Sequence, residues 1–103
     1  MPSKTFTIKN FEISSLNDFL KAIIKDKTIL EYKDKNGSDA YLLACINGHL
    51  EIMKYLENEH NWDIHIKDID GNDAYLCASM RGHLEIMKYL ENEYIYSKNK
   101  NGK

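Results

Sequence analysis

Apolar residues recur at helical spacing along much of this chain. Residues 50–59 show the pattern best, because their apolar positions share one side of a helix: Leu50, Ile52, Met53 and Leu56. The same letters recur over residues 84–93, so the same helix is predicted there. A shorter apolar stretch precedes each of them and predicts helices over residues 40–47 and 74–81. The pattern therefore predicts two pairs of helices.

The two pairs belong to an internal repeat with a period of 34 residues. Residues 33–59 match residues 67–93 at 20 of 27 positions, and the run 48–59 recurs unchanged as 82–93. A fixed period of this length indicates one structural unit used again, with each copy burying its apolar face against the next. The repeat constrains the fold strongly, and it favours binding over catalysis because the unit contains no reactive centre.

Each copy opens with a polar stretch that predicts a tight turn. Asp, Asn and Gly in residues 33–37 and 67–71 supply the positive φ and the local hydrogen bonds that a β-turn needs. Asp39 and Asp73 follow two residues later as predicted helix N-caps. A glycine after each first helix predicts where it ends. The unit is therefore a turn, a helix, a glycine turn, a second helix and an extended return.

This order of elements resembles the ankyrin repeat. The matching residues are Gly37 and Gly71 in the turn, Ala44 and Ala78 in the first helix, the Gly-His-Leu turns at 48–50 and 82–84, and the Ile-Met-Lys-Tyr-Leu run of the second helix. The resemblance covers residues 33–93 in full and the flanks in part. It implies an all-α ankyrin solenoid of helix-turn-helix units with β-turn fingers, in which two full repeats lie between partial caps. The abundance of Asn, Lys and Ile is similar to that in the ankyrin proteins of giant DNA viruses of amoebae, which implies a viral source.

The start of the first helix departs from the ankyrin family. Its usual Thr-Pro-Leu-His is replaced by Asp-Ala-Tyr-Leu at residues 39–42 and 73–76. Without the histidine, a hydrogen bond typical of adjacent fingers is lost, and the leucine makes the seam between repeats more apolar. The tyrosine adds a hydroxyl that needs a partner if it is buried.

The flanks extend the array in shortened form. Ser15 can cap a helix that runs to about Lys25. The predicted apolar face of this helix holds Leu16, Phe19, Leu20, Ile23 and Ile24. It would be the second helix of an N-terminal cap, preceded by an extended strap over residues 5–12. Residues 95–102 echo residues 64–71, so a third finger is predicted to begin there. The expected parts of the single domain are the N-terminal strap and cap at 1–32, the first repeat at 33–66, the second repeat at 67–94 and the start of a third finger at 95–103.

The seven positions that differ between the copies indicate a surface that reads a partner. In the ankyrin family, partner contacts lie at the finger tip and along the exposed face of the first helix, where five of the seven differences fall. Carried over to this chain, the contact positions are Lys35, Asn36, Ser38, Ile46, Asn47, Ile69, Asp70, Asn72, Met80 and Arg81. Free drift of exposed residues would give the same pattern. We favour Ile46 and Met80 as apolar anchors, with partial burial under the next helix as the alternative.

Trp62 lies in the loop after the second helix of the first copy. It is either an exposed anchor for a partner, a role in which tryptophan is common, or a side chain packed over the helix ends. We favour packing.

The charge balance argues against nucleic acid and membranes as partners. The net charge is −2, and Arg81 is the single arginine beside 13 lysines, whereas proteins that read bases and phosphates usually prefer arginine. Residues 1–10 lack the apolar centre of a signal peptide, and no apolar run approaches the roughly 18 residues of a membrane span. We therefore expect a cytoplasmic location, in the host cytoplasm if the source is viral.

The reactive residues form no familiar site. Cys45 and Cys77 occupy non-equivalent places in the repeat and are expected to be buried thiols, with a disulfide or a metal pair as the alternative. His49 and His83 recur because the Gly-His turn recurs, and the other two histidines lack the companions of a closed zinc site. A nucleophile elbow, a P-loop and a glycine-rich phosphate loop are all missing from the sequence. We expect no enzymatic activity, no metal and no cofactor.

Three functions stay open at this point. The leading hypothesis is a module that binds a host or viral protein through its finger tips and the concave face of its first helices. The second is a structural protein that forms homo-oligomers by stacking its open repeat ends. The third is a substrate adaptor of a ubiquitin ligase, although such viral ankyrin proteins normally carry an F-box-like segment, and none is evident in these residues.

Overall fold

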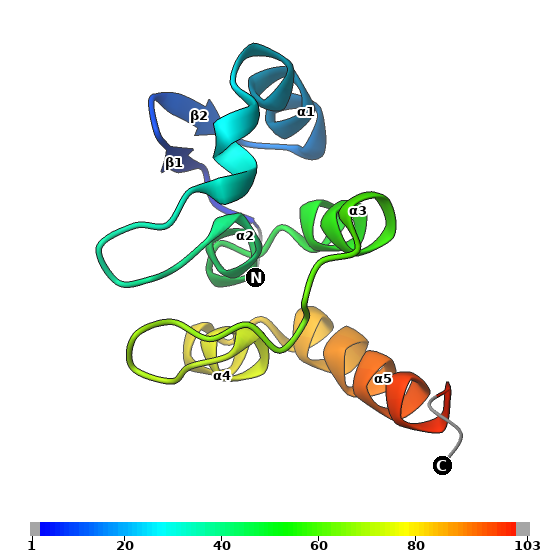
Figure 1. The fold of residues 1–103 in the computed structure, drawn as a ribbon. Helices are drawn as coiled ribbons and strands as arrows, with labels where there is room; N and C mark the ends of the chain where they lie inside the picture. The colour runs from blue at the N-terminus through cyan, green and yellow to red at the C-terminus, as the bar shows by residue number, and fades with distance from the viewer. Residues whose placement is uncertain (1–2, 101–103) are drawn as a thin grey trace.

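The computed structural model describes residues 3–100 and stacks them in three layers (Figure 1). The upper layer contains a hairpin of β1 (Phe6–Ile8) and β2 (Phe11–Ile13), followed by α1 (Leu16–Lys25) and the 3₁₀ helix η1 (Lys27–Glu31). The middle layer contains α2 (Ala40–Ile46) and α3 (Leu50–His60), and the lower layer contains α4 (Ala74–Arg81) and α5 (Leu84–Lys100). The loops before α2 and α4 project on the same side of the stack.

The predicted capping residues set the limits of both first helices. A carboxylate oxygen of Asp39 accepts a hydrogen bond from the backbone N–H three residues further on at 3.0 Å, and Asp73 does the same at 2.9 Å. Gly48 and Gly82 follow the two helices with φ values of 82° and 73°, which a residue with a side chain adopts only at a cost. Both first helices therefore begin where the sequence predicts, α4 also ends as predicted, and α2 ends one residue earlier, at Ile46.

An aspartate closes each finger. We call residues 33–38 the first finger and residues 67–72 the second finger. Asp34 Oδ1 accepts hydrogen bonds from the backbone N–H groups of Asn36 and Ser38, both at 2.9 Å. Asp68 Oδ1 accepts from the equivalent N–H groups of the second finger at the same distance. Because a side chain inside the turn holds it closed, the residues at the tip are free to vary.

The tyrosine that distinguishes these repeats has the partner that its hydroxyl needs. Tyr41 is fully buried, and its hydroxyl donates to Glu57 Oε2 at 2.7 Å. Tyr75 donates to Glu91 Oε2 at the same distance in the second repeat. Burial raises the pKa of Tyr41, and the bond to Glu57 raises it further, so the phenol stays protonated and remains a donor.

One hydrophobic core runs through all three layers. Its largest fully buried apolar and aromatic side chains are Ile8, Ile13, Phe19, Ile29, Tyr41, Leu42, Ile52, Met53, Leu56 and Leu90. Between the repeats, α2 packs directly on α4, with the small residues Ala44, Ala74 and Ala78 buried in this part of the core. The repeats therefore stabilise one another rather than folding as separate units.

The N-terminal strap is a β-hairpin, so the all-α expectation is wrong for this segment. β1 and β2 pair antiparallel, with Phe6 opposite Ile13 and Ile8 opposite Phe11. Phe6, Ile8 and Ile13 are buried, because alternate residues of a strand face the same side. The domain is therefore mostly helical, with a small hairpin that covers its N-terminal end.

The cap helix α1 begins as predicted, but its buried face is narrower. Ser15 Oγ accepts from the N–H of Asp18 at 3.2 Å, which confirms the N-cap. Phe19, Ala22 and Ile23 are buried, whereas Ile24 is 79% exposed. The buried positions are three and four residues apart, and Ile24 lies beyond the stripe that they form on the helix.

The start of a third finger, expected at residues 95–103, is not found where the structure describes the chain. Residues 95–100 belong to α5, and residues 101–103 lie outside the described part. Comparison with the first repeat explains why α5 is longer than α3. There, α3 is followed by its C-cap Asn61, which has a φ of 51° in the left-handed region. Ile95 occupies the equivalent place in the second repeat, and a β-branched residue disfavours that conformation strongly. The helix therefore continues.

Trp62 and the cysteines contribute to packing. Trp62 is half-buried against the core, and its indole N–H donates to Asp39 Oδ2 at 3.1 Å. Cys45 and Cys77 are buried free thiols. Trp62 therefore packs on the fold and both cysteines are buried thiols, as we favoured from the sequence.

Candidate partner-binding surface

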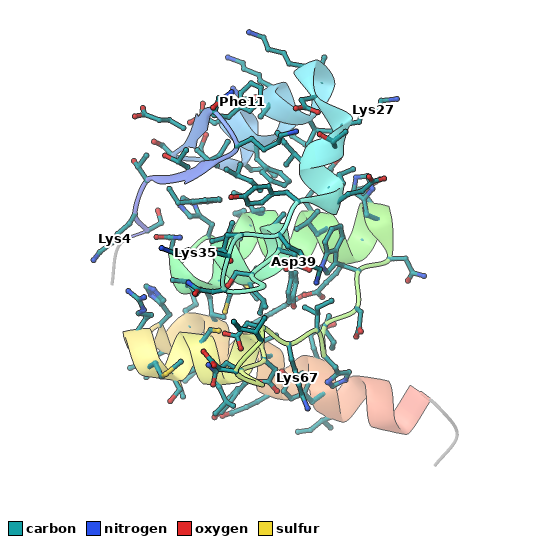
Figure 2. All side chains as sticks on the ribbon, turned by 60° about the vertical axis from the view of Figure 1, so that its left-hand side comes forward. Lys4, Phe11, Lys27, Lys35, Asp39 and Lys67 are labelled. Carbon is teal, nitrogen blue, oxygen red and sulfur yellow. The ribbon has the colours of Figure 1, made fainter. Side chains whose placement is uncertain are left out.

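The two fingers lie side by side and are joined by a backbone hydrogen bond. The N–H of Ile69 donates to the carbonyl of Asn36 at 3.0 Å. Figure 2 turns both loops toward the viewer, with Lys35 on the first finger, Asp39 at its return into α2 and Lys67 at the start of the second finger. The fingers and the first helices therefore border one continuous surface.

A groove of about 220 Å³ lies on this surface, between the fingers and the first helices. It is lined by Asn36, Ser38, Ile46, Asp68, Asp70, Cys77, Met80 and Arg81. Six of these eight residues belong to the ten contact positions taken from the sequence. We call this hollow the finger groove.

The other four predicted positions lie outside the finger groove. Lys35 and Ile69 are exposed at the finger tips, and Ile69 is 72% exposed. Asn47 and Asn72 are half-buried, and both side-chain amides are used within the fold. The Asn47 amide donates to the carbonyl of Leu43 at 2.8 Å, and the Asn72 amide donates to Asp68 Oδ2 at 3.3 Å. These two asparagines therefore hold local structure, while Lys35 and Ile69 remain accessible.

The two positions favoured as anchors differ in accessibility. Met80 is 64% exposed, and Ile46 is half-buried at the seam between α2 and α4. Ser38 also lines the finger groove, although only 3% of its surface is exposed. Met80 is therefore the main exposed apolar group of the finger groove.

The finger groove has charges of both signs. The backbone N–H of Asn72 holds the pKa of Asp68 below its ordinary value, so this carboxylate is anionic at neutral pH. Asp70 is exposed beside it on the finger, and Arg81 is exposed in the last turn of α4. Neither Asp68 nor Cys77 is among the contact positions taken from the sequence. Asp68 is identical in both copies, and Cys77 replaces Leu43 at a position that looked like core. Burial raises the pKa of Cys77 to about 11, so this wall of the groove is a neutral thiol.

A larger hollow of about 340 Å³ lies beside α1 and contains none of the predicted contact positions. Its apolar lining is Phe11, Ala22 and Ile24, with charged side chains of both signs around them. Within the described residues, no three His, Cys, Asp or Glu side chains come together in a way that could hold a metal ion. In the same part of the chain, none of the helices has the length and apolar character needed to cross a bilayer.

The sequence matches the family model described as "Ankyrin repeats (3 copies)" over residues 11–101. The chain therefore belongs to the ankyrin-repeat family. The match begins within the N-terminal segment, where α1 lies 34 residues before α3 and follows a hairpin instead of a first helix.

Among solved structures, the fold is similar to a chain in the complex of the predatory endopeptidase Bd0816 from Bdellovibrio bacteriovorus with the immunity protein Bd3460. The TM-score is 0.64 at 22% sequence identity, and the match covers 75% of this chain and 39% of the other. This chain therefore spans well under half of the chain that it matches, and the likeness concerns the fold. A search of curated proteins gave no match.

Proposed function

We propose that this chain is a non-enzymatic module that binds a protein partner through the finger groove and the finger tips. The observation that carries the proposal is the convergence of Asn36, Ser38, Ile46, Asp70, Met80 and Arg81 on one groove. These positions differ between two copies whose second helices are identical through residue 93. Constant second helices keep the shape of the repeats, while the varied residues of the groove can fit a particular partner.

The side chains of the finger groove supply suitable chemistry. Met80 offers an exposed and adaptable apolar group, and Arg81 offers a planar cation, both of which are enriched in protein interfaces. Asp68 and Asp70 add carboxylates on the finger side. A partner segment that places an apolar side chain on Met80 and a basic group near the finger would complement the groove.

Membership of the ankyrin family supports an interaction role rather than catalysis. The solved structure with a similar fold is itself a complex of two proteins, which is compatible with this use of the fold. A viral source, a host partner, a cytoplasmic setting and the role of a ubiquitin-ligase adaptor stay predictions, which rest mainly on the resemblance to viral ankyrin proteins.

Affinity capture with matched variants tests the proposal. The groove variants are Met80→Glu and Arg81→Glu. Their controls are Ile24→Glu, at an exposed apolar position on α1, and Lys88→Glu, at an exposed cation on α5. Circular dichroism first establishes that all four variants are folded. We expect the wild type and both controls to retain the same protein from lysate, and both groove variants to lose it. If the five capture profiles coincide, the finger groove is not the binding surface.

A further inference from the structure

A cavity of about 350 Å³ lies on the first repeat, apart from the finger groove. It lies where three segments meet: the chain that leaves η1, the start of α2 and the loop that follows α3. Its volume is within the range of roughly 300–1,000 Å³ that is usual for ligand pockets. In the described chain, the residues that line it all differ from those of the finger groove, so the two hollows are separate.

Aromatic and aliphatic side chains form part of the cavity wall. Tyr32 and Trp62 both line it and are half-buried, so each side chain keeps part of its surface accessible. Trp62 is held in place, because its indole N–H donates to Asp39 Oδ2 at 3.1 Å. Leu30 and Ile66, both half-buried, complete the apolar part of the wall. A ring that is already held in place loses little conformational freedom when a ligand packs on it.

Three carboxylates and one ammonium group line the same cavity. Glu31 and Asp63 are exposed, whereas Asp39 is only 4% exposed. The ammonium group belongs to Lys33, which is exposed. Asp39 accepts hydrogen bonds from a backbone N–H and from the Trp62 indole, but among the described side chains it forms no ion pair. The cavity therefore has an excess of negative charge, and one of its carboxylates is buried without a cation beside it.

The end of α3 adds to this negative potential. His60, the last residue of the 11-residue helix, and its C-cap Asn61 both line the cavity. The backbone carbonyls at the C-terminus of a helix carry the negative end of the helix dipole, which favours a cation nearby. Side chains and backbone therefore both favour a positively charged ligand in this cavity.

The equivalent positions of the second repeat have a different chemistry. A shift of 34 residues replaces the exposed acid Glu31 by His65. The same shift replaces the exposed acid Asp63 by Ser97. His65 stacks on Tyr94, with the two ring centroids 5.0 Å apart. The acidic rim is therefore particular to the first repeat and does not follow from the way in which repeats stack.

We propose that this cavity, which we call the cation pocket, binds an arginine side chain of a protein partner. The planar guanidinium stacks on the ring of Tyr32 or Trp62, as arginine commonly does on aromatic faces. Its N–H groups bond to the carboxylates of Glu31 and Asp63 at the rim, and its aliphatic stem packs on the apolar part of the wall. The proposal does not depend on the finger groove.

Trp62 makes the test direct, because it is the single tryptophan of the chain and its indole N–H gives one NMR signal from the pocket itself. The probe is the peptide acetyl-Gly-Arg-Gly-amide, and its control carries citrulline, which is neutral and nearly the same shape. We expect the arginine peptide to shift the indole signal in a saturable way. The citrulline peptide should bind about fivefold more weakly or less, because the cation–π contact and the ion pairs are lost. Free arginine, another source of a guanidinium, should bind no more tightly than the peptide.

Two substitutions remove the exposed charges of the cation pocket and keep its shape. Glu31→Gln and Asp63→Asn should each weaken binding of the arginine peptide by about twofold to fivefold, as expected for a surface ion pair. An asparagine at position 63 can still accept from the N–H of His65, as Asp63 does at 2.9 Å. The matched control is Asp70→Asn, which removes an exposed carboxylate of the finger groove and should leave the affinity unchanged. Circular dichroism establishes that all three variants are folded.

An indole signal that shows no saturable shift, or that responds equally to the arginine and citrulline peptides, would overturn the proposal. So would an equal loss of affinity in Asp70→Asn and Glu31→Gln, because binding would then follow the net charge of the protein. Tighter binding of free arginine would assign the cation pocket to a small molecule instead. Met80→Glu alters the finger groove and should leave this titration unchanged, so failure of one site can be told from failure of the other.

Discussion

The phenol of Tyr89 on α5 donates a 2.6 Å hydrogen bond to the carboxylate of Glu57 on α3, across the seam between the two repeats. Glu57 accepts a second bond from the buried Tyr41 of its own repeat. The Lys54 ammonium lies 5.3 Å from the ring centroid of Tyr89 and adds a favourable cation–π contact. The Glu57 carboxylate on α3 therefore bonds both to α2 of its own repeat and to α5 of the next repeat.

Replacing Tyr89 by Phe should destabilise the protein by about 1–2 kcal/mol, because a half-buried carboxylate loses one of its two donors. The matched control is Tyr75→Phe, which removes the equivalent bond to the exposed Glu91 in the second repeat. That carboxylate is exposed to water, so we expect a loss below about 0.5 kcal/mol. Urea unfolding at constant m-value measures both. Equal losses in the two variants would show that the seam bond contributes nothing beyond the bond within a repeat.

The features that the sequence predicted correctly depend on neighbours close in the chain. Asp39 caps α2 through the N–H three residues later, and Gly48 ends the helix through its own positive φ. Such signals are local, so they can be read without a structure. Six of the eight residues that line the finger groove are among the contact positions taken from the sequence, and a seventh, Cys77, also differs between the copies. Their contact with a partner stays a prediction.

The features that the sequence did not predict have no clear local signal in the sequence. The hairpin turns at Lys9, which has a φ of 56°, and it contains no glycine to indicate a turn. The third finger was expected because residues 95–102 resemble residues 64–71 in sequence. However, Ile95 occupies the place of Asn61, the residue that caps the end of α3 in the first repeat. The roles of Asn47 and Asn72 in bonding to nearby groups of the fold were also hidden, because an exposed asparagine in a partner contact looks the same in sequence.

The stability of the protein should depend on pH through Glu93. Burial raises the pKa of Glu93 above its ordinary value of 4.5, the nearby carboxylate of Glu57 adds to this, and Lys54 opposes it. Because the pKa of Glu93 is higher in the folded state than in the unfolded state, folding favours the protonated form of this side chain. The contribution of Glu93 to the stability of the fold is therefore most favourable below pH 4.5, and it is lost as the pH rises through the raised pKa. Glu93→Gln should consequently be more stable than the wild type at pH 7, and this gain should vanish below pH 4.5.

The control for this prediction is Glu59→Gln. Glu59 is the equivalent residue in the first repeat and is exposed. Its substitution should leave the midpoint of thermal unfolding unchanged at both pH values. A gain for Glu93→Gln that is the same at pH 4 and pH 7 would mean that packing of the amide, rather than ionisation, is responsible.

Trp62 should contribute through its hydrogen bond as well as its size. Its indole N–H donates to Asp39 Oδ2, while the other oxygen of this buried carboxylate caps α2. Trp62→Phe keeps an aromatic ring but leaves a buried carboxylate oxygen without its side-chain donor. We expect a loss of about 1–3 kcal/mol, measured by urea unfolding followed by circular dichroism. In an Asp39→Ser background, a serine hydroxyl can still cap α2, but the carboxylate oxygen that accepts from Trp62 is gone. Trp62→Phe should therefore lower the free energy of unfolding by measurably less in this background.

The glycine turns allow backbone strain to be separated from contact between repeats. Gly48 and Gly82 both have positive φ, so alanine at either position should cost about 1–2 kcal/mol through the backbone alone. A Cβ on Gly48 would also lie 3.0 Å from Cε1 of His83 and 3.3 Å from Cα of Ser3, whereas a Cβ on Gly82 would meet nothing within 4 Å. Gly48→Ala should therefore be the more destabilising of the two, and the excess should shrink in a His83→Ala background. Equal losses for Gly48→Ala and Gly82→Ala would mean that the seam relaxes around the new methyl group, and that the close approach of the two repeats at this turn is not needed for their stacking.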